Sequence, residues 1–299
     1  KQIEFMIVVP AFLKLLKTAI EAELKNSPIH VRAMFKFMFK IAKFIPSYRI
    51  KKLMFNKIHK KFGGHFSGCI SGGAPLDLAV GEFFERIGIK VYQGYGLSEA
   101  SPVVSVNVDR HGDLASVGAP LQSLEAKIDD ETGELILRGP SVMRGYHNQP
   151  EMTSEVLESD GWLHTGDIAK IRNGHIYITG RIKNMIVLSG GKKVFPEEVE
   201  VVLEKSPYIA EVCVLGTSRS FGAKDGTEEI TVVAVPTEDV ISKYDADTVE
   251  KLIKDEIKKL SLRLTAYKRP VNIVVRIEPL PSTTTRKVKR KEVKQFVNI

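Results

Sequence analysis

Apolar and polar positions follow a helical period in the first sixty residues of the chain. After Pro10, which can open a helix, apolar side chains recur at the 3.6-residue spacing that gives a helix one apolar face: Phe12, Leu13, Leu16, Ile20 and Leu24. The pair Ser27-Pro28 is a second start signal, and we expect a helix from there to about Phe44. A third helix is expected to end at about Lys61, before two glycines.

The period changes at about residue 63, where short apolar runs begin to alternate with helical segments. One expected strand ends at Ile70, residues 76–87 are expected to form a helix, and residues 89–91 form the next strand. In a sheet built this way, ligands bind beyond the carboxyl ends of the strands. The loops that follow these two strands are therefore expected to lie at a ligand-binding edge.

From residue 113 the pattern changes to short strands and turns. The segment Asp129–Gly133 indicates a hairpin turn between strands at residues 125–128 and 134–137. Trp162, the single tryptophan, is expected to fill space in the core rather than contact a ligand. This middle part therefore predicts a small antiparallel structure.

After residue 180 helices and strands are mixed again. Strands are expected near residues 186–188, 210–215, 230–235 and 272–277. A helix should begin at Pro196, and a short basic helix at Lys289. Asp247 and Glu250 resemble a capping box on a helix that ends at about Leu262.

Length and composition indicate a globular protein of two domains. The 299 residues are 43% hydrophobic and 27% charged, and no apolar run reaches the roughly 18 residues that a membrane-spanning helix needs. Cys69 and Cys213 lie in apolar runs, which favours two buried free thiols in a reducing cytoplasm over a disulfide. The histidines lack ligand spacing, so we expect no zinc site.

The basic character of the chain is local. Residues 1–62 contain fourteen Lys and Arg and three Glu, a net charge of +11, so the remaining residues sum to −3 because the whole chain is +8. Eleven of these bases and no acidic residue lie between Lys25 and Phe62, and one helical face carries four of them: Arg32, Lys36, Lys40 and Lys43. The pattern fits a solvated face over an ordinary core, or a surface that rests on anionic lipid. Nucleic acid is disfavoured because none of its recognition motifs occurs.

The chemistry of the chain centres on the stretch Gly94–Ala100, GYGLSEA. Gly94 and Gly96 let the backbone pass close to a ligand, and Tyr95 offers a flat aromatic face. Ser98 supplies a hydroxyl and Glu99 a hard oxygen ligand for Mg²⁺. These groups suit a nucleotide, with its ring on Tyr95, a phosphate near Ser98 and the metal ion at Glu99.

Four other motifs accompany this stretch in a fixed order. They are SGGAPL at 71–76, HTGD at 164–167, GRIKN at 180–184 and LPSTTTRKVKR at 280–290. In this order the set resembles the adenylate-forming enzymes, which include acyl-CoA synthetases, luciferases and peptide-synthetase adenylation domains. The segment Tyr95–Asn107 (YGLSEASPVVSVN) is most similar to long-chain fatty acid–CoA ligases.

The resemblance implies an α/β fold in two parts. Residues 1–180 would belong to the large AMP-binding domain, with basic helices at 1–62, an α/β part at 63–112 and a small β-barrel at 113–180. Residues 181–299 would form a small, mobile α+β lid domain.

The resemblance also assigns roles in ATP binding. The loop Gly72-Gly73-Ala74-Pro75 and Tyr95 would enclose adenine, and Gly96 belongs to the same nucleotide site. Ser98, where relatives often have Thr, would contact the α-phosphate, and Glu99 would hold Mg²⁺. Asp167 would accept both ribose hydroxyls, and Arg181 would contact the same ribose.

The small domain would carry three further functional positions. Lys287, six residues after Pro281 as in the family pattern, would neutralise charge between carboxylate and α-phosphate, although Arg286 stands where the family has Gly. Lys183 occupies the hinge position. The CoA pantetheine would pass the loop formed by Ser189, Gly190, Gly191 and Lys192.

The expected function is therefore ATP-dependent activation of a long-chain fatty acid and its transfer to CoA in the cytoplasm. An anionic membrane surface is a further partner if the basic face rests on lipid rather than on solvent. Two alternatives stay open: an enzyme that makes only acyl-AMP or hands the acyl group to a carrier protein, and a non-catalytic nucleotide- or lipid-binding module. The family's phosphate loop, rich in Ser, Thr and Gly and ending in Pro-Lys, does not occur in these residues. We therefore expect the chain to be the carboxyl-terminal part of a longer enzyme and inactive alone.

Overall fold

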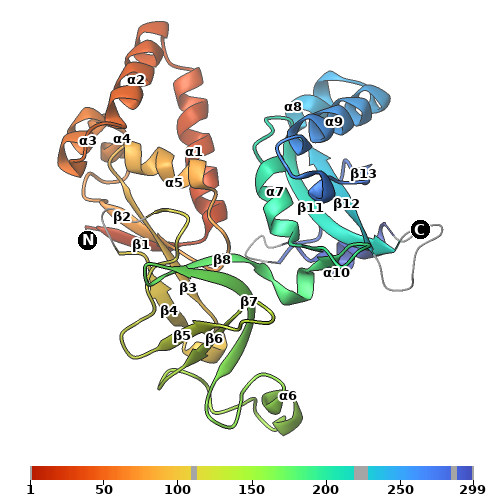
Figure 1. Cartoon of the computed structure of the whole chain (residues 1–299). Helices are drawn as coiled ribbons and strands as arrows, with labels where there is room; N and C mark the ends of the chain where they lie inside the picture. The colour runs from red at the N-terminus through yellow and green to blue at the C-terminus, as the bar shows by residue number, and fades with distance from the viewer. Residues whose placement is uncertain (1, 109–112, 219–227, 284–287, 298–299) are drawn as a thin grey trace. The chain divides into compact units, whose positions relative to one another are not determined.

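The computed structural model describes residues 2–108, 113–218, 228–283 and 288–297. The chain divides into two compact units (Figure 1). Unit 1 comprises Lys1–Thr165 and Ala169–Ile178, and unit 2 comprises Gly166–Ile168 and Thr179–Ile299. The division passes through the strand pair β7–β8, so this hairpin contributes residues to both units.

A four-stranded sheet forms the centre of unit 1. Its order is β1-β2-β3-β4, with the first three strands parallel and the last antiparallel. The strands are β1 (Phe5–Val8), β2 (Gly68–Ser71), β3 (Lys90–Gly96) and β4 (Val103–Val106). Helices α1 (Pro10–Lys25) and α5 (Leu78–Arg86) provide the crossovers, and their apolar faces share one buried cluster with the sheet. The predicted alternation of strand and helix is therefore confirmed.

The basic segment of unit 1 folds into three helices, not two. They are α2 (Ile29–Ala42), α3 (Tyr48–Met54) and α4 (Asn56–Lys61). The expected single helix ending at Lys61 is interrupted at Phe55, whose dihedral angles of −104° and 28° are not helical. Its ring is buried and lies edge-on to Phe35, with centroids 5.5 Å apart. The need to bury this ring explains the interruption of the helix better than a helix-breaking residue in the local sequence does.

A second sheet, of order β5-β6-β7-β8, follows in the chain. Its strands are β5 (Glu125–Ile128), β6 (Glu134–Arg138), β7 (Leu163–Arg172) and β8 (His175–Arg181), and a short helix, α6 (Pro150–Ser154), precedes β7. The predicted turn between β5 and β6 is present: Gly133 has a φ of +76°, and Asp129 accepts hydrogen bonds from the amide and hydroxyl of Thr132. Trp162 is buried beneath Lys127 and Arg138. Closure of this part into a barrel stays a prediction.

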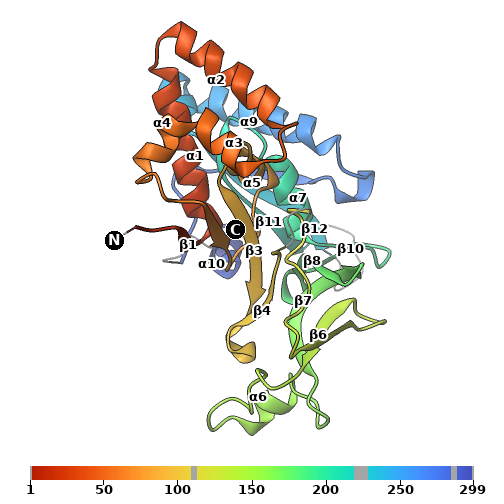
Figure 2. The same ribbon diagram turned by 90° about the vertical axis from the view of Figure 1, so that its left-hand side faces the viewer.

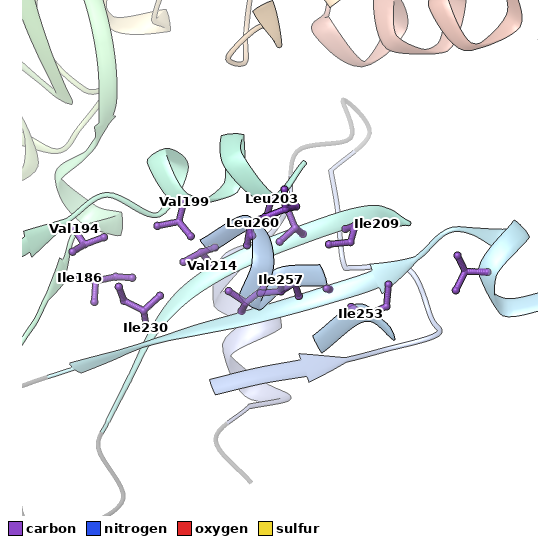
Figure 3. Close-up of a cluster of buried hydrophobic side chains, with 14 of the residues drawn as sticks. Ile186, Val194, Val199, Leu203, Ile209, Val214, Ile230, Ile253, Ile257 and Leu260 are labelled. Carbon is purple, nitrogen blue, oxygen red and sulfur yellow. The ribbon is translucent and has the colours of Figure 1, made fainter. Parts of the chain in front are cut away.

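Unit 2 is built on a three-stranded sheet covered on both faces. Strands β11 (Ile209–Ser218) and β12 (Glu228–Pro236) are antiparallel, and β13 (Asn272–Val275) lies parallel to β12. Side chains alternate along β11, so Val212 and Val214 enter one apolar cluster while Cys213 and Leu215 enter the other. Figure 3 shows the larger cluster, to which α7 (Pro196–Leu203) and α9 (Ala246–Ser261) contribute. The other face is covered by α10 (Arg290–Gln295).

The amino-terminal cap of α9 differs from the expected one. Asp245, rather than Asp247, is the capping residue: its Oδ1 accepts the amide of Thr248 at 3.0 Å, and its Oδ2 accepts the Thr248 hydroxyl at 2.7 Å. These bonds lower the pKa of the Asp245 carboxyl. The extended dihedral angles that a cap needs occur at Asp245, whereas Asp247 already lies in the first turn. The short helix α8 (Glu238–Lys243) was not predicted.

A largely buried ion-pair cluster fastens α10 to the rest of unit 2. Arg290 donates to Glu200 through both terminal nitrogens, to Glu197 at 3.3 Å and to the carbonyl of Val214 at 2.9 Å. Its side chain is 22% exposed, and that of Glu200 is 13% exposed. Because α7 supplies both carboxylates, one guanidinium ties α10 to α7 and to β11.

Replacing Arg290 by Met should destabilise unit 2 substantially. The substitution keeps much of the side-chain volume but leaves two largely buried carboxylates without their cation, which typically costs about 3–5 kcal/mol in the free energy of unfolding. Lys294→Met on the same helix is the matched control, since the Lys294 ion pair with Glu228 is more exposed and should contribute less than about 1 kcal/mol. Urea unfolding of both variants measures the difference, and equal losses would contradict this account.

Candidate functional site

Two of the predicted nucleotide-binding segments lie together at one edge of the unit 1 sheet. Strands β2 and β3 are parallel neighbours, and Ser71 pairs with Gln93, so the loop Gly72–Pro75 leaves β2 beside the point where β3 continues into Gly94. The segments are in contact, since a Cβ on Gly72 would lie 3.2 Å from the carbonyl oxygen of Gly94. A side chain at Gly72 would therefore push against the β3 backbone.

The position of Tyr95 differs from the expected one. We expected a loop after the strand at residues 89–91, but β3 continues to Gly96 and Tyr95 lies opposite Ser105 of β4. The continuation depends on Gly96, where a Cβ would lie only 1.8 Å from the carbonyl oxygen of Pro102. Gly96 therefore permits the close approach of two strands. Tyr95 is consequently held in a strand, which fixes its position more firmly than a loop would.

Ser98 and Glu99 follow β3 in a single turn of 3₁₀-helix (Ser98–Ala100). Ser98 is exposed, and Glu99 is half-buried. The next residue, Ser101, has a φ of +57°, a left-handed conformation that is uncommon for a residue with a side chain. Such strain is often found at functional sites, where the surrounding fold maintains it. Here the chain turns sharply enough to present Ser98 and Glu99 at the end of the strand.

Tyr146 is a neighbour of Glu99 that the sequence analysis missed. Its hydroxyl donates to Glu99 Oε1 at 2.9 Å, and the amide of Met143 donates to the Glu99 carbonyl at 2.7 Å. Burial and the carboxylate of Glu99 raise the pKa of the Tyr146 phenol, which keeps it a hydrogen-bond donor. The two residues are 47 positions apart, and no periodic pattern connects them. Only the GYHNQP run around Tyr146 could have drawn attention to this segment.

The residues present are compatible with Mg²⁺ bound mainly by a substrate. Among the described residues, no group of three or more His, Cys, Asp or Glu side chains could hold a metal ion. Mg²⁺ in nucleotide sites is commonly held by one or two carboxylates together with phosphate oxygens and water. The single oriented carboxylate of Glu99 fits that requirement. The described residues do not offer enough ligands to hold a metal ion without the substrate.

Asp167 and Arg181 are brought together within unit 2. Asp167 is buried on β7, and Arg181 ends β8, the adjacent strand of the hairpin. Arg181 Nε donates to Asp167 Oδ1 at 2.5 Å. The two side chains to which we assigned the ribose thus form one charged pair, with Arg181 fixing the orientation of the carboxylate.

The predicted hinge and CoA positions are exposed parts of unit 2. Lys183 lies in a 3₁₀ turn (Ile182–Asn184), and the neighbouring Asn184 donates to Glu197 at 2.8 Å. The CoA loop joins the short strands β9 (Ile186–Val187) and β10 (Lys193–Val194), with Gly190 and Gly191 both at positive φ. Lys192 Nζ lies 4.8 Å from the centroid of the Tyr267 ring. Lys287 lies outside the described residues.

His164, part of the HTGD motif, connects two acidic side chains of unit 1. Its Nδ1 is 2.8 Å from Glu134 Oε2, and its Nε2 is 2.8 Å from Glu158 Oε1. The hydrogen bond with the buried Glu134 raises the pKa of the imidazole, and the bond with Glu158 adds to this effect. The motif was recognised, but the partners lie 30 and 6 residues away and could not be predicted.

The contribution of His164 to stability should depend on pH. Because its folded-state pKa is raised, the stabilisation is fully present below the unfolded value of about 6.5 and is lost as pH rises through the folded value. The melting temperature of His164→Gln should therefore fall below that of the original protein most clearly near pH 5.5, and the difference should shrink toward pH 9. His30→Gln, on the exposed surface of α2, is the control. A pH-independent difference would contradict the predicted ionisation.

Two curated proteins are similar to this chain over three quarters of its length. A long-chain-fatty-acid–[acyl-carrier-protein] ligase of Arabidopsis thaliana is 34% identical over 75% of this chain and 33% of its own length. A long-chain-fatty-acid–CoA ligase of Bacillus subtilis is 37% identical over 75% of this chain and 40% of its own length. The chain thus spans well under half of these relatives.

Solved structures share the fold. The ATP-bound MatB of Rhodopseudomonas palustris matches with a TM-score of 0.69 and 26% identity, covering 98% of this chain and 50% of that one. The model of the AMP-binding enzyme family matches residues 1–147, and the model of the AMP-binding enzyme C-terminal domain matches residues 183–297. Since the two models together cover most of the sequence, the chain belongs to the AMP-binding enzyme family.

Proposed function

We propose that this chain is part of an enzyme that uses ATP to convert a long-chain fatty acid into acyl-AMP and then into acyl-CoA. The observation that carries the proposal is the grouping of Gly72–Pro75, Tyr95 and Glu99 at the carboxyl ends of two adjacent parallel strands. The name of the Bacillus subtilis relative supports fatty acid and CoA as substrates, and the ATP-bound relative supports the nucleotide. Because the chain spans less than half of the curated relatives, activity belongs to the whole protein.

The first half-reaction must bring two anions together. A fatty acid carboxylate oxygen attacks the α-phosphorus of ATP, the bond to the β-phosphate bridging oxygen breaks, and pyrophosphate leaves. Such chemistry depends on position and charge more than on covalent catalysis by the protein. Mg²⁺, when bound, would offset phosphate charge, with Glu99 as the protein ligand that Tyr146 orients. The cation that we assign to the developing charge is Lys287.

Substrate positioning falls to the other assigned residues. Tyr95, held in β3, would stack on adenine against the Gly72–Pro75 loop. Ser98, exposed at the end of the strand, would donate to the α-phosphate. A ribose diol can donate two hydrogen bonds to one carboxylate, and we assign this role to Asp167, with Arg181 holding that carboxylate in place.

The second half-reaction would transfer the acyl group to a thiol. The sulfur of CoA attacks the acyl carbon of acyl-AMP, and AMP leaves. We assign the loop Ser189–Lys192 to the pantetheine arm because two glycines at positive φ leave its backbone open to close approach. Lys183 would be the hinge about which the small domain turns between the two half-reactions.

A carrier-protein thiol is the second candidate acceptor, because the Arabidopsis relative is named for that activity. Adding CoA or a holo carrier protein to pre-formed acyl-AMP distinguishes the two acceptors.

A non-catalytic nucleotide-binding module fits less well, since Glu99, Asp167, Arg181 and Lys287 are all present. A module that only binds a nucleotide would not need Lys287, which we assign to the negative charge that develops as the carboxylate joins the α-phosphate.

We infer further that the protein works in the cytoplasm at an anionic membrane surface. Nine of the eleven bases between Lys25 and Phe62 are exposed, and no acidic residue separates them. Fatty acids partition into membranes, so such a surface would place the enzyme near its substrate.

Adsorption to vesicles tests this location. The chain should sediment with phosphatidylglycerol vesicles, and binding should weaken as salt is added because the Debye length shortens. Equal binding to neutral phosphatidylcholine vesicles would indicate that the basic segment is an ordinary solvated face.

The two half-reactions should respond oppositely to changes at Lys287 and Lys183. In a protein of the relatives' full length that contains this chain, Lys287→Ala should slow acyl-AMP formation by at least about 100-fold with little change in ATP affinity, because the cation is needed while two anions join. Acyl transfer from pre-formed acyl-AMP should be largely retained. Lys183→Pro should slow transfer and spare adenylation, because proline fixes φ at about −65° and stiffens the hinge.

Measuring both half-reactions in both variants gives four rates, which test the roles assigned to Lys287 and Lys183. Lys192→Ala serves as a control that should weaken CoA use without changing pyrophosphate release. Equal slowing of both steps by Lys287→Ala would make that residue structural. An unchanged profile in Lys183→Pro would place the hinge elsewhere.

A further inference from the structure

Helix α2 has three distinct faces, and only one of them is used for packing. Phe35, Met38, Phe39 and Ala42 enter the buried cluster of unit 1. The Phe39 ring contacts that of Phe83, with centroids 5.5 Å apart. This face attaches α2 to the body of the unit and determines which of its other side chains point to solvent.

The second face of α2 is basic. Arg32, Lys36, Lys40 and Lys43 follow one another at spacings of three and four residues, and all are exposed. Repulsion among like charges at this spacing is unfavourable for the helix by itself. The arrangement is therefore better explained by an anionic partner than by helix stability.

The third face is apolar and exposed. We call Met34, Phe37 and Ile41 of α2, together with Phe44 just beyond its end, the apolar ridge. They recur at spacings of three, four and three residues, and their exposed fractions are 50%, 66%, 39% and 78%. A surface helix usually carries polar side chains outside its packed stripe. Figures 1 and 2 both place α2 at the end of unit 1 opposite α6, away from the second sheet.

We propose that the apolar ridge inserts shallowly into an anionic lipid surface while the adjoining basic face contacts the headgroups. The inference rests on the proposed adsorption to a membrane and names the structural element responsible. Helices that lie in a membrane interface combine an apolar face with a Lys- and Arg-rich polar face. Among the residues that the structure describes, no helix is long and apolar enough to cross a membrane. An orientation of α2 in the plane of the surface would bring the apolar ridge to the acyl chains and the basic face to the headgroups.

Charge favours lipid over a second copy of the chain. The basic face adjoins the ridge on the same helix, so two copies packed ridge to ridge would bring two sets of Lys and Arg together. Anionic headgroups would neutralise the same side chains. Burial of the ridge and pairing of the basic side chains are therefore both favourable at an anionic lipid surface, whereas between two copies of the chain the charges oppose burial.

A single dye attached to the ridge tests insertion directly. Burial raises the pKa of the Cys69 and Cys213 thiols to about 12, so both should be unreactive toward a thiol-specific probe. The chain with Phe37→Cys, labelled with an environment-sensitive dye, should show a blue shift with phosphatidylglycerol vesicles and quenching by lipids that carry a shallow spin label. Met152→Cys on α6, where the native side chain is 49% exposed, is the matched control and should show neither.

Affinity measurements separate the two components. Phe37→Ser with Phe44→Ser should weaken vesicle binding by at least about tenfold, since two largely exposed aromatic rings no longer gain burial, while its salt dependence persists. Lys36→Gln with Lys40→Gln should instead flatten the salt dependence. Lys170→Gln with Arg172→Gln, an exposed pair on β7, should change neither.

Several results would overturn the proposal. Vesicle binding without a shift at the Phe37 label would mean adsorption by charge alone, and absence of binding would overturn both membrane inferences while leaving acyl activation to its own assay. A shift that appears with protein concentration alone would indicate a second copy. Protection of the label without vesicles in a protein of the relatives' full length would mean that another part of that protein covers the ridge.

Discussion

The parallel pairing of β2 with β3 is the constraint on which the candidate nucleotide site depends. Parallel neighbours end at the same edge of a sheet, so the register that places Ser71 beside Gln93 also places the Gly72 loop beside Gly94. The chain cannot slip by one residue without moving Cys69 and Val91 out of the core. The burial of apolar side chains on β2 and β3 thus determines where the ligand-binding groups that follow these strands lie.

Close backbone approach extends this control from the strands to Glu99. Gly96 allows β3 to run against β4 without a side chain between them, and the turn that follows carries Ser98 and Glu99. Tyr146 then fixes Glu99 Oε1 from a segment much later in the chain. A carboxylate oriented in this way loses less conformational entropy when it binds a ligand than a free surface glutamate would.

Features governed by local spacing could be predicted from the sequence, and features governed by distant contacts could not. The helix at Pro10, the hairpin at Asp129–Gly133 and the three-stranded sheet of unit 2 follow from periodicity and turn chemistry alone, whereas the short strand β10 was not predicted. The interruption at Phe55 and the extension of β3 through Tyr95 depend on what other parts of the chain place beside them. Neither feature was predicted, because propensity describes a segment and not its surroundings.

The same distinction applies to the charged groups. The motifs identified Asp167, Arg181 and Glu99, but nothing in their spacing indicated that the first two form a pair or that Tyr146 donates to the third. Arg290 lies in the segment that we expected to be a short basic helix, and nothing in that pattern indicated that it pairs with two carboxylates of α7. Sequence identifies which residues carry charge, and tertiary packing decides which of them have partners.

Helix α2 shows how far that principle extends toward function. Its sequence allows one apolar side and one basic side, and both could belong to an ordinary amphipathic helix. Once its core-facing side chains are assigned to the buried cluster of unit 1, the apolar ridge remains exposed, and Phe37 lies beside the basic face. Exposed apolar surface is unfavourable in water, and the neighbouring like charges repel one another. An acidic, apolar-cored surface satisfies both, and a bilayer is such a surface.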